Sequence, residues 1–292
     1  MTTGTTIDRP DWLSATAWPW PTRAVPTAGG RVAVTDVGRG PVMVFVHTGA
    51  WSFVWRDLLS ALSPTFRCIT LDAPGCGLSD RVPGDRVSLQ GSADAVTAVL
   101  EQLDLTEVTL VAHDLGGPAA LAAAAAGPDR IAAIVAVNCF GWRPTGMAFR
   151  GMLAVMGSAP LRASDAALGW LPRATSGRFG VGRHWPTGDR AVFRAGIDRR
   201  ARRSWHRYFA DARSADRIYR KIDTALAGPL ADRPLLTVFG QHNDPLRFQP
   251  RWKQRFPKAR QEVVPGANHF PMCDDPQRVA NLLRSWHRTI AG

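Results

Sequence analysis

Short apolar segments alternate with helical segments along most of this chain, and that alternation constrains its fold more than any other feature. The apolar segments have the lengths of buried strands, and the segments between them carry apolar residues at helical spacing. Strands that alternate with helices pair in parallel and are covered by helices on both faces. We therefore predict an α/β protein with a doubly wound, mostly parallel central sheet flanked by helices. The predicted strands are Arg31–Val37, Pro41–His47, Arg67–Pro74, Val108–His113, Ile131–Val137, Pro234–Gly240 and Arg260–Pro265, and the predicted helices include Ser88–Leu103, a segment from Gly116, and Asp275–His287.

The alternation is interrupted once, between Cys139 and Ala227. This stretch is rich in Gly, Pro, Trp and Arg, contains no candidate strand, and has its best helix at Arg199–Ala225. We predict that residues 139–227 form a helical lid, or cap, while residues 1–138 and 228–292 form the core. The first residues, up to about position 25, are rich in Trp and Pro and are expected to wrap the surface as an arm.

The positive charge of the chain is concentrated in the predicted lid. The net charge is +12, and residues 139–227 contain 16 Arg and one Lys against six Asp, which is +11. Positive potential over a site favours a small-molecule substrate that is anionic or is presented by an acidic carrier protein. The alternative is a solvated Arg-rich surface with no specific partner. No nucleic-acid-binding motif accompanies the arginines, so we expect no nucleic-acid partner.

The cysteines and the hydropathy pattern exclude several classes of protein. The four cysteines are scattered without a CxxC pair, which argues against a zinc site and against a disulfide framework. We therefore expect no metal and no cofactor. The N-terminus lacks a signal-peptide pattern, and no apolar run approaches the ~20 residues of a membrane-spanning helix. These features predict a cytoplasmic protein with no membrane partner.

The strongest local signal is the segment VTLVAHDLGGPAAL, which begins at Val108. A strand, a tight turn and a helix of small residues follow one another, which is typical of a nucleophile elbow. Ala112 and Gly116 flank the central Asp114, because the turn packs strand against helix with little room. A carboxylate at that position can attack an sp3 carbon and form an alkyl ester, which water then hydrolyses. The alternative is that Asp114 caps the following helix.

Two residues that follow later strands complete a predicted catalytic triad. His269, in VVPGANHFPM, lies between the last predicted strand and the closing helix and would be the general base that activates water. Asp244, in VFGQHNDPL, follows Pro234–Gly240 and would orient and stabilise the imidazolium. Both loops follow the carboxyl ends of strands, where sites gather in this architecture.

The loop after Pro41–His47 is predicted to contribute to an oxyanion hole. We assign the backbone N–H of Thr48 or Gly49, together with the N–H of Leu115 after the nucleophile. Other histidine and aromatic side chains, in these loops or in the lid, are candidates for lining the substrate pocket. They are His47, Trp51, His113, Trp142, Tyr208, Tyr219 and Phe270.

These motifs resemble those of the haloalkane dehalogenase and epoxide hydrolase superfamily, over most of the chain except the lid. WSFVWRDLLSALSPTFRCITLDAPGCGLSDR resembles the dehalogenase stretch that follows the family's His-Gly-Asn-Pro-Thr motif. DLGGP resembles Asp-Trp-Gly-Gly-Pro and places the nucleophile at Asp114, while GQHNDPL and GANHF resemble the acid and base loops at Asp244 and His269. The resemblance implies an α/β-hydrolase fold, in which the chain order is nucleophile, acid, histidine.

The chain departs from this family at both halide-binding positions. Leu115 stands where the family has the tryptophan that follows the nucleophile. The loop His47–Trp51 reads HTGAW and lacks the asparagine of the family's His-Gly-Asn-Pro loop. A hydrogen bond to a charged group contributes about 1.5–3 kcal/mol, so the missing donors predict slow departure of chloride.

Four functions remain open from the sequence. The first is dehalogenase-like hydrolysis through an alkyl-enzyme ester. The second is epoxide hydrolysis, favoured because the only two tyrosines, Tyr208 and Tyr219, both lie in the lid. The third is a specialised biosynthetic reaction, either ester or lactone hydrolysis or a non-hydrolytic rearrangement. The fourth is a non-enzymatic binding protein, against which the set of Asp114, Asp244 and His269 argues.

Overall fold

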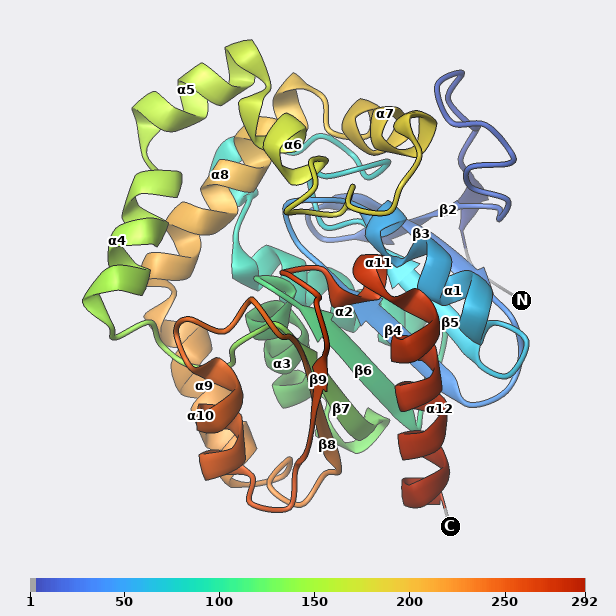
Figure 1. The fold of residues 1–292 in the computed structure, drawn as a ribbon, viewed down its shortest axis with the longest axis vertical. Helices are drawn as coiled ribbons and strands as arrows, with labels where there is room; N and C mark the ends of the chain where they lie inside the picture. Colours follow the sequence, from blue (N-terminus) through green and yellow to red (C-terminus); the bar gives the residue numbers. More distant parts are fainter. Residues whose placement is uncertain (1–3, 292) are drawn as a thin grey trace.

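The computed structural model describes residues 4–291, and its centre is a nine-stranded sheet with helices on both faces (Figure 1). The order across the sheet is β1-β2-β3-β5-β4-β6-β7-β8-β9. From β5 to β9 every neighbouring pair is parallel, and β1, β2 and β3 add an antiparallel edge. The strands are β1 (Thr5–Thr6), β2 (Arg23–Thr27), β3 (Gly30–Val37), β4 (Val42–Val46), β5 (Arg67–Leu71), β6 (Val108–His113), β7 (Ile131–Val137), β8 (Leu235–Gly240) and β9 (Arg260–Val264).

Helices cover both faces because the central strands are apolar on both sides. β6 is buried along its whole length, as a strand in the middle of a parallel sheet should be. Helices α2 (Leu89–Gln102) and α3 (Gly116–Ala126) pack together on one face, and α1 (Arg56–Leu62) and α12 (Pro276–Ala291) pack together on the other. The remaining core helices are η1 (Ser52–Trp55), η2 (Gly84–Arg86), η3 (Pro128–Arg130), α10 (Phe248–Arg255) and α11 (Pro271–Asp274).

The predicted mostly parallel sheet flanked by helices is confirmed, and the N-terminus differs from its prediction. Part of the expected arm forms β1 and β2, and β2 pairs with β3 along its length. Pro26 lies near the end of β2, where a missing N–H is tolerated. Leu13 and Trp18 pack into the core, so the rest of this segment lies against the protein as expected.

Residues 139–227, called the helical insertion below, lie between β7 and β8 in the chain. Throughout this described stretch the structure has helices and no strand. The expected single helix Arg199–Ala225 is two helices, because Ala215 leaves the helical conformation and α9 then packs on α3. The six helices are α4 (Met147–Met156), α5 (Ala159–Leu168), α6 (Trp170–Thr175), α7 (Thr187–Ala195), α8 (Arg199–Ser214) and α9 (Asp216–Ala227). Within residues 4–291, none of the helices is long and apolar enough to cross a membrane.

Ion pairs attach the helical insertion to the core, and in each of them the insertion supplies the acid. Asp189 accepts from Arg56 at 2.9 Å, Asp198 from Arg81 at 3.2 Å, and Asp223 from Arg255 at 2.6 Å. Half of the insertion's six aspartates are therefore turned toward core arginines. These three aspartates are therefore not paired with the arginines of the insertion itself.

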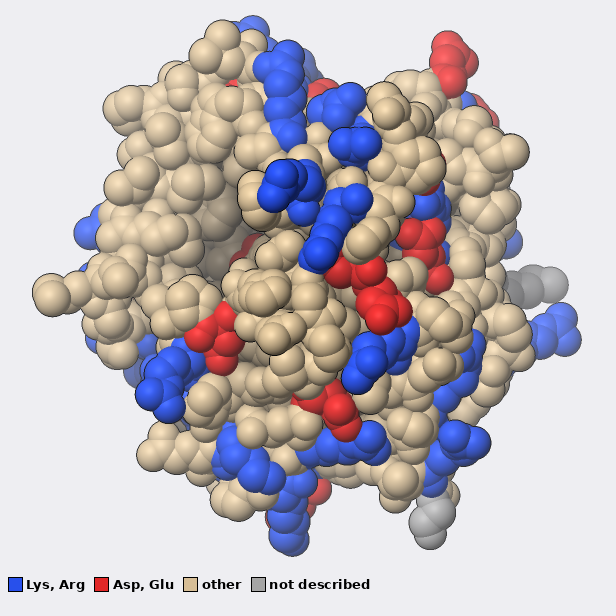
Figure 2. Space-filling model, in the orientation of Figure 1, with Lys and Arg blue, Asp and Glu red and all other residues tan. Residues whose placement is uncertain are grey.

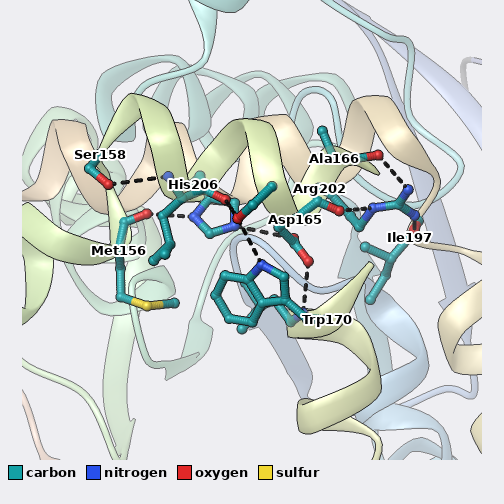
Figure 3. A network of polar contacts seen from close by, with 11 residues as sticks. Met156, Ser158, Asp165, Ala166, Trp170, Ile197, Arg202 and His206 are labelled. Atoms are coloured by element: carbon teal, nitrogen blue, oxygen red, sulfur yellow. Dashed lines mark hydrogen bonds and ion pairs between the residues drawn. The ribbon is translucent and has the colours of Figure 1, made fainter. Parts of the chain in front are cut away.

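A buried polar network holds the helices of the insertion together (Figure 3). Nε2 of His206 on α8 lies 3.1 Å from Oδ2 of Asp165 on α5, and neither side chain is exposed. The other carboxylate oxygen of Asp165 accepts from the backbone N–H of Leu171 at 2.7 Å, and Nδ1 of His206 donates to the carbonyl of Met156. Arg202 donates to the carbonyls of Asp165 and Ala166, so α4, α5, α6 and α8 meet at one point.

We predict that Asp165→Ala destabilises the protein strongly. The substitution leaves the buried imidazole of His206 and the N–H of Leu171 without their acceptors, and removing one partner of a buried pair costs about 3–5 kcal/mol. Urea denaturation should show this loss in the free energy of unfolding. Asp232→Ala, at an exposed position, is the control and should change it little. Equal stability of the two variants would contradict a structural role for the network.

Candidate active site

Asp114 occupies a sharp turn between β6 and α3. Its φ of +51° is in the left-handed region, which a non-glycine residue adopts only where the surroundings hold it there. A Cβ at Gly116 would lie 2.5 Å from the carbonyl oxygen of Val46, and one at Gly117 would lie 2.6 Å from that of Phe140. These contacts explain why small residues follow Asp114. The turn has the geometry predicted for a nucleophile elbow, with its side chain presented at the end of the strand.

The carboxylate of Asp114 faces His269. Oδ1 of Asp114 lies 3.8 Å from Nε2 of His269, which is longer than a hydrogen bond, and the two side chains are 22% and 31% exposed. Desolvation raises the pKa of Asp114, but the facing imidazole of His269 lowers it by more. The net pKa of Asp114 is therefore about 2. The group is therefore ionised at neutral pH. No side chain caps the N-terminus of α3, so Asp114 is not the helix cap considered as its alternative role.

The structure corrects the prediction for the third member of the triad. Nδ1 of His269 lies 3.0 Å from the side-chain amide of Asn243. Asp244 instead caps α10, because its two carboxylate oxygens accept from the backbone N–H groups of Phe248 and Gln249 at 2.6 and 3.0 Å. A neutral amide therefore stands where a carboxylate was expected. Asp244 and Asn243 are neighbours in one loop, and the sequence could not show which of them turns toward the histidine.

Two buried residues at the carboxyl ends of parallel strands hold the backbone of His269. The carbonyl of His269 accepts from Nε2 of His113 at 2.7 Å and from Nδ2 of Asn138 at 2.8 Å. Oδ1 of Asn138 accepts from the N–H of Gly240 at 3.1 Å, so Asn138 also joins the loops after β7 and β8. The sequence analysis did not select Asn138. Its position directly after Ile131–Val137, at the carboxyl end of a strand, was the signal that could have found it.

His47 and His113 support the site from below. Burial lowers the pKa of His113 well below its ordinary value and that of His47 to about 4, so both are neutral. His113 donates from Nε2, so its Nδ1 accepts from Nδ1 of His47 at 3.1 Å. Nε2 of His47 is then an unprotonated, buried atom, and within residues 4–291 it has no hydrogen-bond partner. Phe270 packs against the rings of His47, His113 and His269.

The other four predicted pocket residues are buried, and three of them donate hydrogen bonds to backbone carbonyls. The indole of Trp51 donates to the carbonyl of Phe193 at 3.0 Å. Tyr208 and Tyr219 are buried, and their hydroxyls donate to the carbonyls of Pro74 at 2.9 Å and Ala212 at 2.7 Å. Trp142 is buried in an aromatic cluster beside α10. These four side chains stabilise the packing around the site, and neither tyrosine hydroxyl is available to a substrate in this conformation.

The predicted oxyanion loop lies directly under helix α8. Gly49 has a φ of +89°, and a Cβ there would lie 2.2 Å from Nε1 of Trp205. Nε1 of Trp205 and the hydroxyl of Thr48 are buried, and neither has a hydrogen-bond partner in the described part of the chain. The side chain of Leu115 is buried in the core. The oxyanion roles of Thr48, Gly49 and Leu115 stay predictions, and Trp205 is a residue near this loop that the sequence analysis did not select.

The surface above this part of the molecule is hollowed. Figure 2 shows a hollow between the uncharged surface over α4 and α5 and a group of basic side chains over α6 and the loop that follows it. An acidic side chain is visible in the floor of the hollow. The partial exposure of Asp114 and His269 is consistent with a site that small molecules reach without unfolding the insertion.

Comparisons with known proteins agree with this geometry. Residues 43–282 match the alpha/beta hydrolase family. Haloalkane dehalogenase 2 of Mycobacterium tuberculosis is 28% identical over 277 residues, which are 91% of this chain and 94% of that protein. A cis-3-alkyl-4-alkyloxetan-2-one decarboxylase of Xanthomonas campestris is 26% identical over 285 residues, which are 87% and 92% of the two chains.

Solved structures share the fold. The haloalkane dehalogenase DbeA from Bradyrhizobium elkani has a TM-score of 0.78 at 19% identity and matches 92% of this chain and 97% of its own. The epoxide hydrolase CorEH has a TM-score of 0.78 at 18% identity and matches 92% and 99%. At this level of identity the likeness establishes the architecture alone.

We predict that Gly49→Ala disturbs the contact between the oxyanion loop and α8. The new methyl group would overlap the indole of Trp205, and overpacking of this kind costs about 1–3 kcal/mol. Urea denaturation and the tryptophan emission spectrum should report the loss of stability and a more exposed indole. Gly188→Ala is the matched control, since a Cβ at that helical position meets no atom within 4 Å. Indistinguishable variants would mean that Trp205 does not rest on this loop.

Proposed function

The chain belongs to the alpha/beta hydrolase family, and we propose that it is a haloalkane dehalogenase-like enzyme in which Asp114 is the nucleophile and His269 the general base. The observation that carries this proposal is an ionised carboxylate on a strained elbow, 3.8 Å from an imidazole. Asp114 would attack an sp3 carbon, expel the leaving group and form an ester. His269 would then take a proton from a water that attacks the ester carbonyl.

Departure of the leaving group needs a donor, since Leu115 provides no polar side-chain group. Among the tryptophans of the insertion, Trp170 donates to Ser164 and Trp185 donates to Asp57. Trp205 is different, because its N–H is buried beside Gly49 and has no hydrogen-bond partner among residues 4–291. We propose Trp205 as the donor that stabilises negative charge on the leaving group or on the ester carbonyl.

Two tyrosines in the lid favoured epoxide hydrolysis, but the structure directs their hydroxyls away from that role. A tyrosine that protonates an opening epoxide must present its hydroxyl to the substrate, whereas Tyr208 and Tyr219 donate to backbone carbonyls. Burial also raises the pKa of both phenols. The likeness to CorEH concerns the fold.

A second candidate is the decarboxylation of a β-lactone, the reaction named for the Xanthomonas relative. Asp114 would attack the sp3 ring carbon that bears the ring oxygen, breaking that C–O bond and releasing a carboxylate. The carboxylate would then leave as CO2. Its C–C bonding electrons would form the alkene and expel Asp114 from the adjacent carbon. Lactone becomes alkene and CO2, the enzyme is regenerated, and no water is consumed.

Asn243 is the observation that favours this second candidate. In the observed orientation its amide donates to Nδ1 of His269, so the proton of a neutral imidazole lies on Nε2, facing Asp114. That tautomer cannot accept a proton from water at Nε2. A neutral amide also gives no charge stabilisation to an imidazolium. Decarboxylation needs neither a proton acceptor at Nε2 nor a stabilised imidazolium, because it has no step that activates water.

We predict that His269→Gln separates the two candidates. With a bromoalkane substrate the alkyl ester on Asp114 should accumulate, because its hydrolysis depends on His269, and intact-protein mass spectrometry should detect the added alkyl mass. Asp114→Asn is the control and should form no adduct. With a cis-3,4-dialkyl β-lactone, the same variant should still release alkene and CO2 if the enzyme is a decarboxylase.

The possible results have distinct meanings. Trapped ester from the bromoalkane supports the hydrolytic proposal, whereas alkene formation that survives His269→Gln but not Asp114→Asn supports decarboxylation. Normal turnover of every substrate by Asp114→Asn would refute both, because both begin with attack by this carboxylate.

We predict that Asn243→Asp speeds the hydrolytic step by about tenfold or more, since a carboxylate on Nδ1 fixes the useful tautomer and stabilises the imidazolium. Single-turnover decay of the ester, measured by mass spectrometry, reports this step alone. Asp244→Asn, in the same loop, is the control. It replaces one of two acceptor oxygens at the start of α10 by an amide nitrogen and should mainly destabilise this helix end, by about 1 kcal/mol. The opposite pattern, in which Asp244→Asn stops hydrolysis and Asn243→Asp changes nothing, would make Asp244 the catalytic acid.

A further inference from the structure

Helix α4 has an apolar face that no other part of residues 4–291 covers. Its sequence, MAFRGMLAVM, contains one charged residue, and a helix that is apolar on all sides is normally buried. Phe149 and Leu153 do point inward, but Met147 is 90% exposed and Val155 is 59% exposed. Met147 and Val155 are eight positions apart and therefore lie on one side of the helix.

Exposed apolar side chains are concentrated in the helical insertion. Seven large hydrophobic side chains are exposed among the described residues, and five of them belong to the insertion. Besides those of α4, Leu168 ends α5 and is 63% exposed, and Phe179 lies in the loop after α6 and is 70% exposed. Larger exposed apolar patches that are rimmed by polar residues mark sites of interaction with proteins or membranes.

Arginines lie near several of these exposed groups. Arg150 lies on α4 itself, Arg173 donates to the carbonyl of Leu168, and the guanidinium of Arg178 lies 4.6 Å from the ring centre of Phe179. In Figure 2 an uncharged surface over α4 and α5 is bordered by basic groups over α6 and the loop beyond it.

Few acids neutralise this surface. Of the insertion's six aspartates, Asp189, Asp198 and Asp223 pair with core arginines, and Asp165 is buried with His206. Asp211 accepts from the N–H of Leu89 of the core. The sixth, Asp216, pairs with Arg143 within the insertion. The carboxylates of five of these six aspartates therefore bind groups other than the arginines of the insertion.

We infer that the helical insertion docks on the surface of an anionic lipid bilayer, with the apolar face of α4, Leu168 and Phe179 entering the interface and the arginines contacting headgroups. Protruding apolar groups flanked by arginines combine the two attractions by which peripheral proteins bind such surfaces. Binding to the surface of a membrane needs no membrane-spanning helix, so the lack of one among residues 4–291 does not argue against this inference. The inference does not depend on the reaction proposed above, although docking would place the hollow beside α4 next to membrane-dissolved substrates.

Co-sedimentation of the full-length protein with lipid vesicles tests the inference. The protein should pellet with vesicles made of equal parts phosphatidylcholine and phosphatidylglycerol, and only weakly with phosphatidylcholine alone. Raising the ionic strength should weaken binding, since screening shortens the range of the arginine–headgroup attraction.

Matched variants localise the contact. Met147→Ser with Val155→Ser should reduce vesicle binding by about tenfold, and each of Arg173→Gln and Arg178→Gln by about fivefold. The controls change exposed residues of the same kinds outside the insertion. They are Leu246→Ser with Val263→Ser, and Arg278→Gln with Arg288→Gln, and both pairs should leave binding unchanged.

Several results would overturn the inference. One is failure to bind the mixed vesicles at low ionic strength, and another is an equal effect of the control variants. Binding to polyglutamate that is as strong as vesicle binding and insensitive to the α4 variants would indicate a general anion site or an acidic protein partner. Self-association that the α4 variants abolish, without vesicle binding, would show that a second copy of the chain covers this face.

Discussion

The turn at Asp114 is the constraint on which the rest of the site depends. Asp114 can hold a φ of +51° only because Gly116 and Gly117 let α3 lie against the end of β4 and the chain after β7. That packing presents the carboxylate at the edge of the sheet where the loops after β7, β8 and β9 also converge. Asn138, Asn243 and His269 come from these loops. Their interactions with one another therefore follow from the topology of a parallel sheet.

The helical insertion is attached to the core by interactions that also determine its outer surface. Three of its six aspartates pair with Arg56, Arg81 and Arg255 of the core and not with its own arginines. The same attachment lays Trp205 on Gly49, where the indole N–H has no partner in the described residues. One set of contacts thus accounts both for a possible donor inside the site and for the positive charge outside it.

The polar groups around His269 decide which chemistry the site favours. Its carbonyl is held by His113 and Asn138, so the ring is fixed in front of Asp114. Nδ1 of His269 accepts a hydrogen bond from the amide of Asn243, whereas a carboxylate at that position would best support the activation of water. If Asp114 is the nucleophile, as we propose, an imidazole supported by an amide favours the second candidate reaction, whose later step needs no base.

The sequence by itself determined the central sheet, the place of the insertion and the elbow at Asp114, because strand periodicity and small residues around a turn are local properties. It also located the loop of His269 and the concentration of arginine in residues 139–227. Only the tertiary structure decided that Asn243 and not Asp244 reaches His269, and that Tyr208 and Tyr219 point to backbone carbonyls. The choice between adjacent side chains depends on a single loop conformation, and the direction of a helix face depends on what packs against it. Neither the loop conformation nor the packing partner of a helix face is encoded in the spacing of residues along the chain.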